Sequence, residues 1–267
     1  MTEGMSCSPM WSDVVDLRDF YATGLGQTTR RLIGRQIRLF WPDVSGLRLL
    51  GLGFATPYLR VFLGEAERVI ALMPASQGVL PWPPDGPGLT ALADETDLPL
   101  PDRSIDRILM VHTLEGAEQV RVVMREAWRV LADGGRLVVV VPNRRGIWSR
   151  LERTPFGNGR PFTMGQLTRL LRDNMFTPLH RASALFLPPC TTPMLLRTAP
   201  ALERIGQRWC EAFGGVVMIE AAKQIYAGAA GRESRNGRRA YLPVAQGLPR
   251  TIGPARPRVL TEGEKRS

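Results

Sequence analysis

The chemistry-bearing residues of this sequence begin in a short apolar stretch, LLGLGFATPYL, at residues 49–59. An apolar run, a Gly-x-Gly turn and then a helix is how a nucleotide-binding strand-turn-helix unit begins, because glycine lets a ligand approach the backbone closely. Gly51 and Gly53 supply the turn, but Ala55 and Pro57 stand where further glycines are expected. The stretch therefore predicts a cofactor loop that is poor in glycine.

A second group of polar residues lies in ADETDLPLPDRSIDRILMVHTLEG, residues 93–116. Asp94 and Glu95 precede a Leu-Pro turn, and His112 follows the apolar run ILMV. Carboxylates accept hydrogen bonds from the hydroxyl and amino groups of a ligand, and a histidine can donate or accept them. Two structural alternatives stay open, since Asp94 could cap a turn and His112 could cap a helix or be a buried core residue.

These residues are spaced by elements that alternate in type. Runs with strand character occupy residues 47–52, 69–73, 89–92, 105–111 and 136–141, and helical spacing of apolar residues marks residues 116–131. The turn ADGG, residues 132–135, offers a glycine for a left-handed helix cap. Two helices are expected within residues 11–41, two more at 163–171 and 200–210, and a strand at 216–221.

Strands that alternate with helices predict a doubly wound α/β fold with a mostly parallel sheet covered on both faces. In such sheets ligands bind beyond the carboxyl ends of the central strands. The loops to inspect therefore follow Leu52, Met73, Leu92, Val111 and Val141.

The block at residues 94–115 resembles the class I S-adenosylmethionine-dependent methyltransferases, in particular the type 11 methyltransferase subgroup. The resemblance covers roughly residues 46–171 and includes the helix REAWRVL and the strand region ADGGRLVVVVPN, residues 125–143. It implies a Rossmann-like fold, S-adenosylmethionine as cofactor and transfer of its methyl group to an acceptor that the sequence does not identify.

The resemblance also assigns roles to individual residues. Family members have an acidic residue at the position of Gly51 and another, which accepts both ribose hydroxyls, at the position of Met73. A thioether cannot replace that carboxylate, and losing two charged hydrogen bonds should weaken binding by roughly one or two orders of magnitude. Asp94 stands where family members reach the adenine amino group, and His112 stands near the methionine end or the acceptor. The implied cofactor-binding set is Gly51, Gly53, Phe54, Ala55, Met73, Asp94, Glu95 and His112, with no catalytic residue and no metal ligand assigned.

Residues 142–165 follow the last parallel strand and are expected to overhang the site as a substrate cover. Five arginines alternate here with three aromatic residues: Arg144, Arg145, Arg150, Arg153, Arg160, Trp148, Phe156 and Phe162. They could grip an acidic or aromatic acceptor or a nucleic acid. The alternative is a surface loop with solvated arginines, in which the aromatic rings fasten the cover to the core.

The net charge of +10 is concentrated at the carboxyl terminus, where residues 232–267 hold nine basic and three acidic residues. We expect this tail to be disordered, and a solvated tail is favoured over one that binds nucleic acid. Cys7, Cys190 and Cys210 are far apart and are expected to be free thiols, as in a reducing cytoplasm. No signal peptide or membrane span is expected, which favours a cytoplasmic location.

The expected organisation is a pair of helices packed on the core (1–45), a methyltransferase-like domain (46–230) and the basic tail (231–267). The favoured function is methyl transfer from S-adenosylmethionine. The alternative is a catalytically inactive relative that keeps the fold as an interaction or regulatory module, because both family acids and two of the loop glycines are absent.

Overall fold

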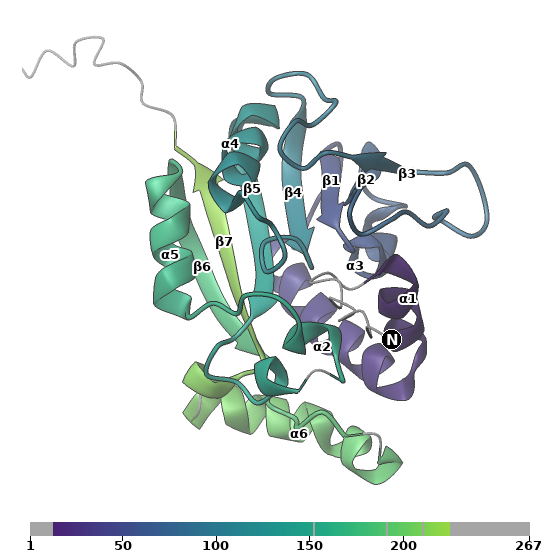
Figure 1. Cartoon of the computed structure of the whole chain (residues 1–267), viewed down its shortest axis with the longest axis vertical. Helices are drawn as coiled ribbons and strands as arrows, with labels where there is room; N and C mark the ends of the chain where they lie inside the picture. Colours follow the sequence, from purple (N-terminus) through teal and green to yellow (C-terminus); the bar gives the residue numbers. More distant parts are fainter. Residues whose placement is uncertain (1–12, 152, 191, 210, 225–267) are drawn as a thin grey trace, which may run out of the picture. The chain divides into compact units, whose positions relative to one another are not determined.

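Seven strands form one sheet in the computed structural model, which describes residues 13–224 except 152, 191 and 210 (Figure 1). The strands are β1 (Arg48–Gly53), β2 (Arg68–Pro74), β3 (Thr90–Ala93), β4 (Ile105–Val111), β5 (Leu131–Pro142), β6 (Phe176–Ala184) and β7 (Val216–Lys223). Their order in the sheet is β3-β2-β1-β4-β5-β7-β6. Strands β1 to β5 pair in parallel, and β7 is antiparallel to both of its neighbours. The doubly wound, mostly parallel fold predicted from the sequence is confirmed.

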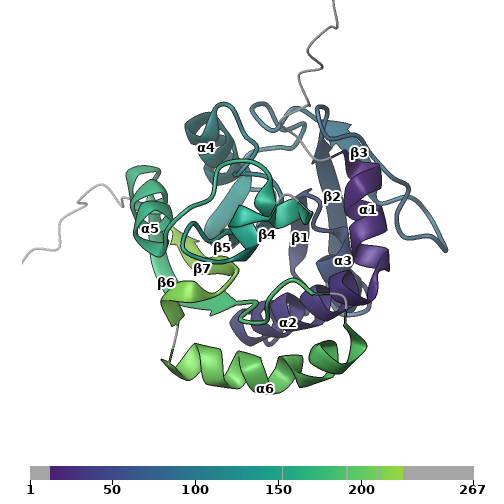
Figure 2. The same ribbon diagram turned by 60° about the horizontal axis from the view of Figure 1, so that its bottom comes forward.

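Helices cover both faces of the sheet because its central strands are apolar on both sides. In β5, Val138 and Val140 pack into one core with residues of α1 (Val14–Ala22), α2 (Gly24–Phe40) and α3 (Thr56–Leu59). Leu137, Val139 and Val141 alternate with them and pack into a second core with α4 (Val120–Val130) and α5 (Met164–Asp173). Figure 2 brings the carboxyl ends of the parallel strands forward, with α1, α2 and α6 (Pro193–Trp209) around them.

The two helices expected near the start are present as α1 and α2. Thr23 separates them, and its hydroxyl accepts a hydrogen bond from the amide of Gly26. Gly24 and Gly26 therefore lie in the first turn of α2. Both helices contribute to the same core as the sheet, and the described residues belong to one compact unit.

Three sequence-based expectations are wrong in detail. The helix expected at 116–131 begins only at Val120, and its cap residue Leu131 is extended, so the glycine cap expected from ADGG is absent; Gly134, with φ +75°, instead lies within β5. The helix expected at 200–210 begins at Pro193 and contains Pro200. Strand β6 was not expected, because it contains a proline and most of the side chains in its first two thirds are not buried, which leaves no apolar run in the sequence.

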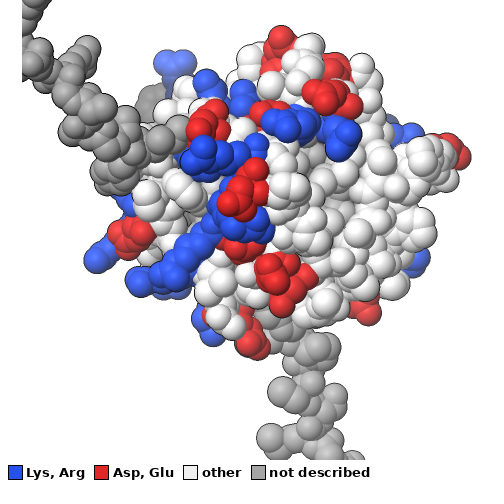
Figure 3. All heavy atoms as spheres, turned by 90° about the horizontal axis from the view of Figure 1, so that it is seen from above, with Lys and Arg blue, Asp and Glu red and all other residues white. Residues whose placement is uncertain are grey.

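Charges of both signs are interleaved on the face at the amino ends of the parallel strands (Figure 3). Arg48 pairs with Asp106 at 2.9 Å and Arg129 with Asp102 at 2.7 Å. This face is therefore not an extended basic surface. The arginine-rich residues 232–267 lie outside the described part of the chain, as do Cys7 and Cys210, whereas Cys190 is a free thiol.

Every helix within the described residues is too short or too polar to cross a bilayer. The same residues contain no group of three histidine, cysteine, aspartate or glutamate side chains placed to hold a metal ion.

Candidate functional site

The glycine-poor loop turns sharply at Gly53, where β1 ends beside β4. Gly53 has φ +74°, and a Cβ atom there would overlap both the Thr113 hydroxyl and the Val111 carbonyl oxygen. The same close approach lets the Phe54 amide donate to that carbonyl at 2.9 Å. Glycine is thus required at this position by the neighbouring strand as well as by the backbone conformation.

Gly51 has a packing role. A Cβ atom at Gly51 would lie 2.5 Å from Leu59 Cδ1 and 2.9 Å from Ala55 Cβ, so this glycine allows α3 to pack closely on β1. Ala55 is fully buried in the same contact. Of the predicted loop residues, Gly51 and Ala55 therefore serve the packing of α3 on β1, whereas Gly53 lies at the carboxyl end of β1 and lines the crevice described next.

A narrow crevice lies beyond the carboxyl ends of β1, β2 and β3. Its lining residues are Leu52, Gly53, Leu72, Met73, Pro74, Ala93, Glu95 and Leu98. The crevice admits no water-sized sphere. Pockets that hold cofactor-sized ligands usually measure about 300–1,000 Å³. In this structure the crevice is therefore closed to a ligand of cofactor size.

A side chain from α1 packs against the loop that follows β1. The Tyr21 ring stacks on Phe54 with 5.7 Å between ring centres, and its hydroxyl oxygen lies 2.8 Å from that of Tyr58. The Tyr21 hydroxyl also lies 3.0 Å from His112 Nε2. Burial raises the pKa of Tyr21 and of Tyr58 well above the ordinary value for tyrosine, so both are neutral donors and acceptors at neutral pH.

Both ring nitrogens and the backbone carbonyl of His112 have hydrogen-bond partners. Its Nδ1 lies 3.1 Å from Oε1 of Glu115, three residues further along the chain, and its carbonyl oxygen accepts a hydrogen bond from the Gln77 side chain at 3.0 Å. The residue has φ +53°, a conformation that non-glycine residues seldom adopt and that is often found at functional sites. Glu115, His112, Tyr21 and Tyr58 therefore form a continuous buried hydrogen-bonded chain.

Two buried acceptors next to His112 have no donor among the described residues. They are Oε1 of Gln77, whose amide nitrogen contacts the His112 carbonyl, and Oε2 of Glu115, whose other oxygen contacts the imidazole. Buried polar atoms in folded proteins are almost always paired. Their presence indicates that this region can offer hydrogen-bond acceptors to a ligand.

The two adjacent acids differ in environment. Asp94 is exposed, and its Oδ1 accepts hydrogen bonds from the Thr96 hydroxyl at 2.6 Å and the Thr96 amide at 2.8 Å, which lower its pKa. Asp94 thus caps a turn, which was the structural alternative for it. Glu95 instead lines the crevice together with Met73. Of the two carboxylates, Glu95 is the one placed to contact a ligand there.

The cover segment is fastened by its aromatic residues. Trp148 is buried and donates from Nε1 to the Leu187 carbonyl at 2.7 Å, and Phe156 packs 5.7 Å from Trp148 and 4.8 Å from His112 between ring centres. The five arginines of the segment are all described, and none of them lines the crevice; Arg144 donates to the Pro161 carbonyl. The aromatic residues therefore act as staples, as the structural alternative for this segment expected.

Some residues at the site carry no sequence signal. Tyr21 lies within the residues 11–41 where two helices were expected, and Tyr58 and Gln77 were not singled out. Their partners are 35 to 91 residues away in the chain. Glu115 is the exception, because its spacing of three residues from His112 indicates a local contact on one side of a turn.

Comparison with known proteins finds a family model that matches the central part of the chain. Residues 51–139 match the family model described as a methyltransferase domain, and this match includes the Gly53 turn, Glu95 and His112. This match, together with the fold shared with solved methyltransferases, supports the class I S-adenosylmethionine-dependent methyltransferase family. The family expected from the block at residues 94–115 is thereby confirmed.

Solved methyltransferase structures share the fold of this chain. A structure of an S-adenosylmethionine-dependent methyltransferase from Thermotoga maritima is 20% identical, covers 79% of this chain and 96% of its own, and has a TM-score of 0.56. One from Mesorhizobium loti is 18% identical, covers 71% and 96%, and has a TM-score of 0.51. At these identities the likeness shows a shared fold alone.

Curated relatives resemble part of the chain. An uncharacterized protein of Mycobacterium tuberculosis is 29% identical over 159 residues, which are 55% of this chain and 56% of the relative. The uncharacterized Escherichia coli protein YafS is 28% identical over 169 residues, 61% of this chain and 66% of its own. The chain thus spans a little over half the length of the first of these relatives.

Proposed function

We propose that this chain binds S-adenosylmethionine at the carboxyl ends of β1 to β4 and transfers its methyl group to an acceptor. The observation that supports the proposal most directly is the family match over residues 51–139, which contains the strands and loops of the crevice. The bound cofactor would supply a methyl group already activated on a sulfonium. The protein would bind, align and exclude water.

The polar groups at the crevice suit this ligand, although the crevice is narrow. Met73 offers no carboxylate at the end of β2, but Glu95 lies in the same crevice and would accept hydrogen bonds from ribose hydroxyls in its place. The unpaired oxygens of Gln77 and Glu115 would accept from further donors of the ligand. Gly53 would form the floor, and Phe54 would remain at the wall.

Cofactor binding would require the closed form to open. Tyr21 fastens α1 over the site through Phe54, Tyr58 and His112, and the amide of Val14 at the other end of α1 donates to the Gln77 carbonyl at 2.8 Å. A shift of α1 would release these contacts together. In that account the free protein is mostly closed, and its apparent affinity is reduced by the fraction of open molecules.

His112 would then act on the acceptor as a general base. Once Tyr21 leaves, Nε2 of His112 is free to take a proton from the attacking group of the acceptor. Glu115, on Nδ1, would fix the orientation of the ring and stabilise the protonated imidazole. This role assigns a catalytic residue where the sequence assigned none.

The test is transfer of a labelled methyl group from S-adenosylmethionine to fractions of an extract from the source cell. Replacing His112 with glutamine should lower the transfer by about 10²- to 10⁴-fold. His180, the other histidine, contacts Glu220 on β7 and provides a matched control, because His180→Gln should leave transfer unchanged. No transfer to any fraction, or equal transfer by both variants, would count against the proposal.

An inactive relative that uses the fold as an interaction module would explain the narrow crevice without any opening. Such a protein would bind neither S-adenosylmethionine nor its product S-adenosylhomocysteine. Direct titration with both therefore separates this second candidate from the enzyme.

A further inference from the structure

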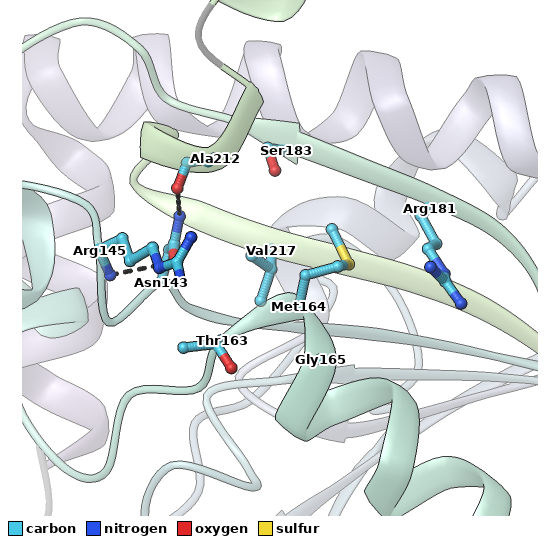
Figure 4. A pocket seen from close by; sticks show the side chains of 9 residues that line it. All are labelled: Asn143, Arg145, Thr163, Met164, Gly165, Arg181, Ser183, Ala212 and Val217. Atoms are coloured by element: carbon cyan, nitrogen blue, oxygen red, sulfur yellow. Dashed lines mark hydrogen bonds between the residues drawn. The ribbon is translucent and has the colours of Figure 1, made fainter.

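A second cavity, separate from the crevice, lies at the same edge of the sheet between β5, β6, β7 and the start of α5 (Figure 4). Its volume is about 430 Å³, large enough for a small organic molecule. The lining residues are Asn143, Arg145, Thr163, Met164, Gly165, Arg181, Ser183, Ala212 and Val217. None of them belongs to the cofactor-binding set expected from the sequence.

Two arginines flank this cavity. Arg145 follows β5, and Arg181 comes from β6 on the other side of Met164, as Figure 4 shows. Neither guanidinium forms an ion pair with a carboxylate in the part of the chain that the structure describes. Two exposed, unpaired positive charges at one cavity attract an anion.

The frame that carries Arg145 is rigid. The Asn143 side chain donates to the Ala212 and Gly214 carbonyls at 2.9 and 2.7 Å, and its own oxygen accepts from the Arg145 amide at 3.1 Å. The end of β5 is thereby fixed to the start of β7. A site built on such a frame keeps its shape without a ligand.

Uncharged donors also face the cavity. Ser183 is only 3% exposed, and its hydroxyl makes no hydrogen bond within the described residues although it lines the cavity. The first two amides of α5, from Met164 and Gly165, are free of intrahelical partners, and the first turn of this helix has no acidic residue. A Cβ atom at Gly165 would meet nothing within 4 Å, so the approach to these amides is open.

The wall between the charges is apolar. Val217 is buried beneath the cavity, and Met164 is partly buried beside it. A carboxylate or phosphate would bind the arginines, the Ser183 hydroxyl and the start of α5. The carbon skeleton attached to it would pack on Met164 and Val217, which favours an organic anion over a simple inorganic ion.

A short segment connects this cavity to the buried chain at His112. The Arg160 amide donates to the Glu115 carbonyl at 2.7 Å, and the Phe162 amide donates to the Pro142 carbonyl at 2.9 Å. Thr163, the next residue, already lines the cavity. Only residues 160–162 therefore separate the contact with Glu115, the partner of His112, from the cavity.

We infer that this cavity binds the carboxylate or phosphate of an organic anion and that this anion is the methyl acceptor. That the anion is the methyl acceptor rests on the proposed function, whereas binding of the anion can be tested by itself. The substrate class inferred in this way is an acidic small molecule.

The experiment is calorimetric titration of the full chain with two probes, inorganic phosphate and glutarate, at low salt. Either probe should bind, and a preference between them distinguishes a phosphate from a carboxylate acceptor. The variants Arg145→Gln and Arg181→Gln should each weaken binding about tenfold, because each removes charged hydrogen bonds. Ser183→Ala should weaken it by a smaller factor. Arg121, an exposed residue of α4, supplies the control Arg121→Gln, which should bind like the unchanged protein.

Titration of the same variants with S-adenosylmethionine separates the two proposals. Affinity for S-adenosylmethionine should be unchanged in Arg145→Gln and Arg181→Gln, because these residues lie outside the crevice. Failure of every protein to bind S-adenosylmethionine would reject the proposed function but leave the anion titration meaningful. Absence of probe binding, or equal binding by all variants, would overturn the inference.

Discussion

The hydroxyl oxygen of Tyr21 lies 3.0 Å from Nε2 of His112, and this contact joins the first helix to the carboxyl end of β4. It occupies the imidazole nitrogen that would otherwise face an acceptor. Because Tyr21 also contacts Phe54 and Tyr58, one side chain links the predicted cofactor loop to the predicted base. The closed crevice and the unavailable histidine are therefore two aspects of the same arrangement.

Replacing Tyr21 with phenylalanine should strengthen S-adenosylmethionine binding by up to about tenfold. The change removes the hydrogen bonds to His112 and Tyr58, each worth about 0.5–1.5 kcal/mol, and so raises the fraction of open molecules. Calorimetric titration measures the affinity, and urea unfolding should show a loss of about 1–3 kcal/mol of stability. Tyr58→Phe keeps the contact between Tyr21 and His112 and should give a smaller gain. Weaker or unchanged binding by Tyr21→Phe would refute the idea that this residue holds the site closed.

Glu95 and Asp94 form a matched pair for locating the cofactor. Glu95→Gln should weaken S-adenosylmethionine binding about tenfold, because a crevice carboxylate is replaced by a weaker acceptor. Asp94→Asn should change it less than about twofold, since Asp94 is exposed and engaged with Thr96. Competition titrations with S-adenosylhomocysteine check both values. The reverse order of effects would show that Asp94 has the role implied by the family resemblance.

The turn at Gly53 should tolerate no side chain. Gly53→Ala should lower the free energy of unfolding by about 3 kcal/mol or more, because the added carbon would lie against Thr113 and the Val111 carbonyl. Gly46 also has a positive φ, of +68°, but a Cβ atom there would have no neighbouring atom within 4 Å. Gly46→Ala should therefore cost only about 1–2 kcal/mol, the penalty of the left-handed conformation alone. Equal losses in urea unfolding would mean that crowding at β4 is unimportant.

Acid should weaken the amino-terminal edge of the sheet through Asp106. Hydrogen bonds from the Arg48 side chain lower the pKa of Asp106 below its ordinary value of 3.8. A carboxyl whose pKa is lowered by folding stabilises the protein above the pKa of the unfolded chain, and this contribution is lost as pH falls through the folded value. Asp106→Asn should remove about 1–2 kcal/mol at pH 7 and much less at about pH 2.

The control for this titration is Asp19, whose pair with Arg18 is largely exposed. Asp19→Asn should change stability by less than about 0.5 kcal/mol at either pH, because solvent screens exposed pairs. Urea unfolding at both pH values makes the comparison. A loss for Asp106→Asn that is as large in acid as at neutral pH would show that its charge is not responsible.

The sheet was largely predictable because its central strands are continuous apolar runs. The stretches around Ile108 and Val139 are buried on both faces, and only a parallel sheet with two helical layers accommodates such runs repeatedly. Strand β6 escaped prediction for the opposite reason. It packs mainly through its ends, while the middle, around His180, faces outward and leaves no alternating pattern.

The site was only partly predictable, because its partners are distant in sequence. Gly53, Glu95 and His112 follow strands, so the general rule for parallel sheets locates them. Tyr21 reaches His112 across 91 residues, and no local pattern indicates which face of a short helix will carry a buried hydroxyl. The second cavity was missed with β6, since Arg181 and Ser183 face it only when that strand is in place.

The most direct test of the central claim is equilibrium titration of the purified chain with S-adenosylmethionine and S-adenosylhomocysteine. A class I methyltransferase with a closed but openable crevice should bind both at micromolar to submillimolar concentration, roughly −8 to −5 kcal/mol. Tyr21→Phe, measured beside it, should bind more tightly. No heat with either ligand at millimolar concentration, in both proteins, would contradict the account and leave the fold as the only property shared with the enzymes of this family.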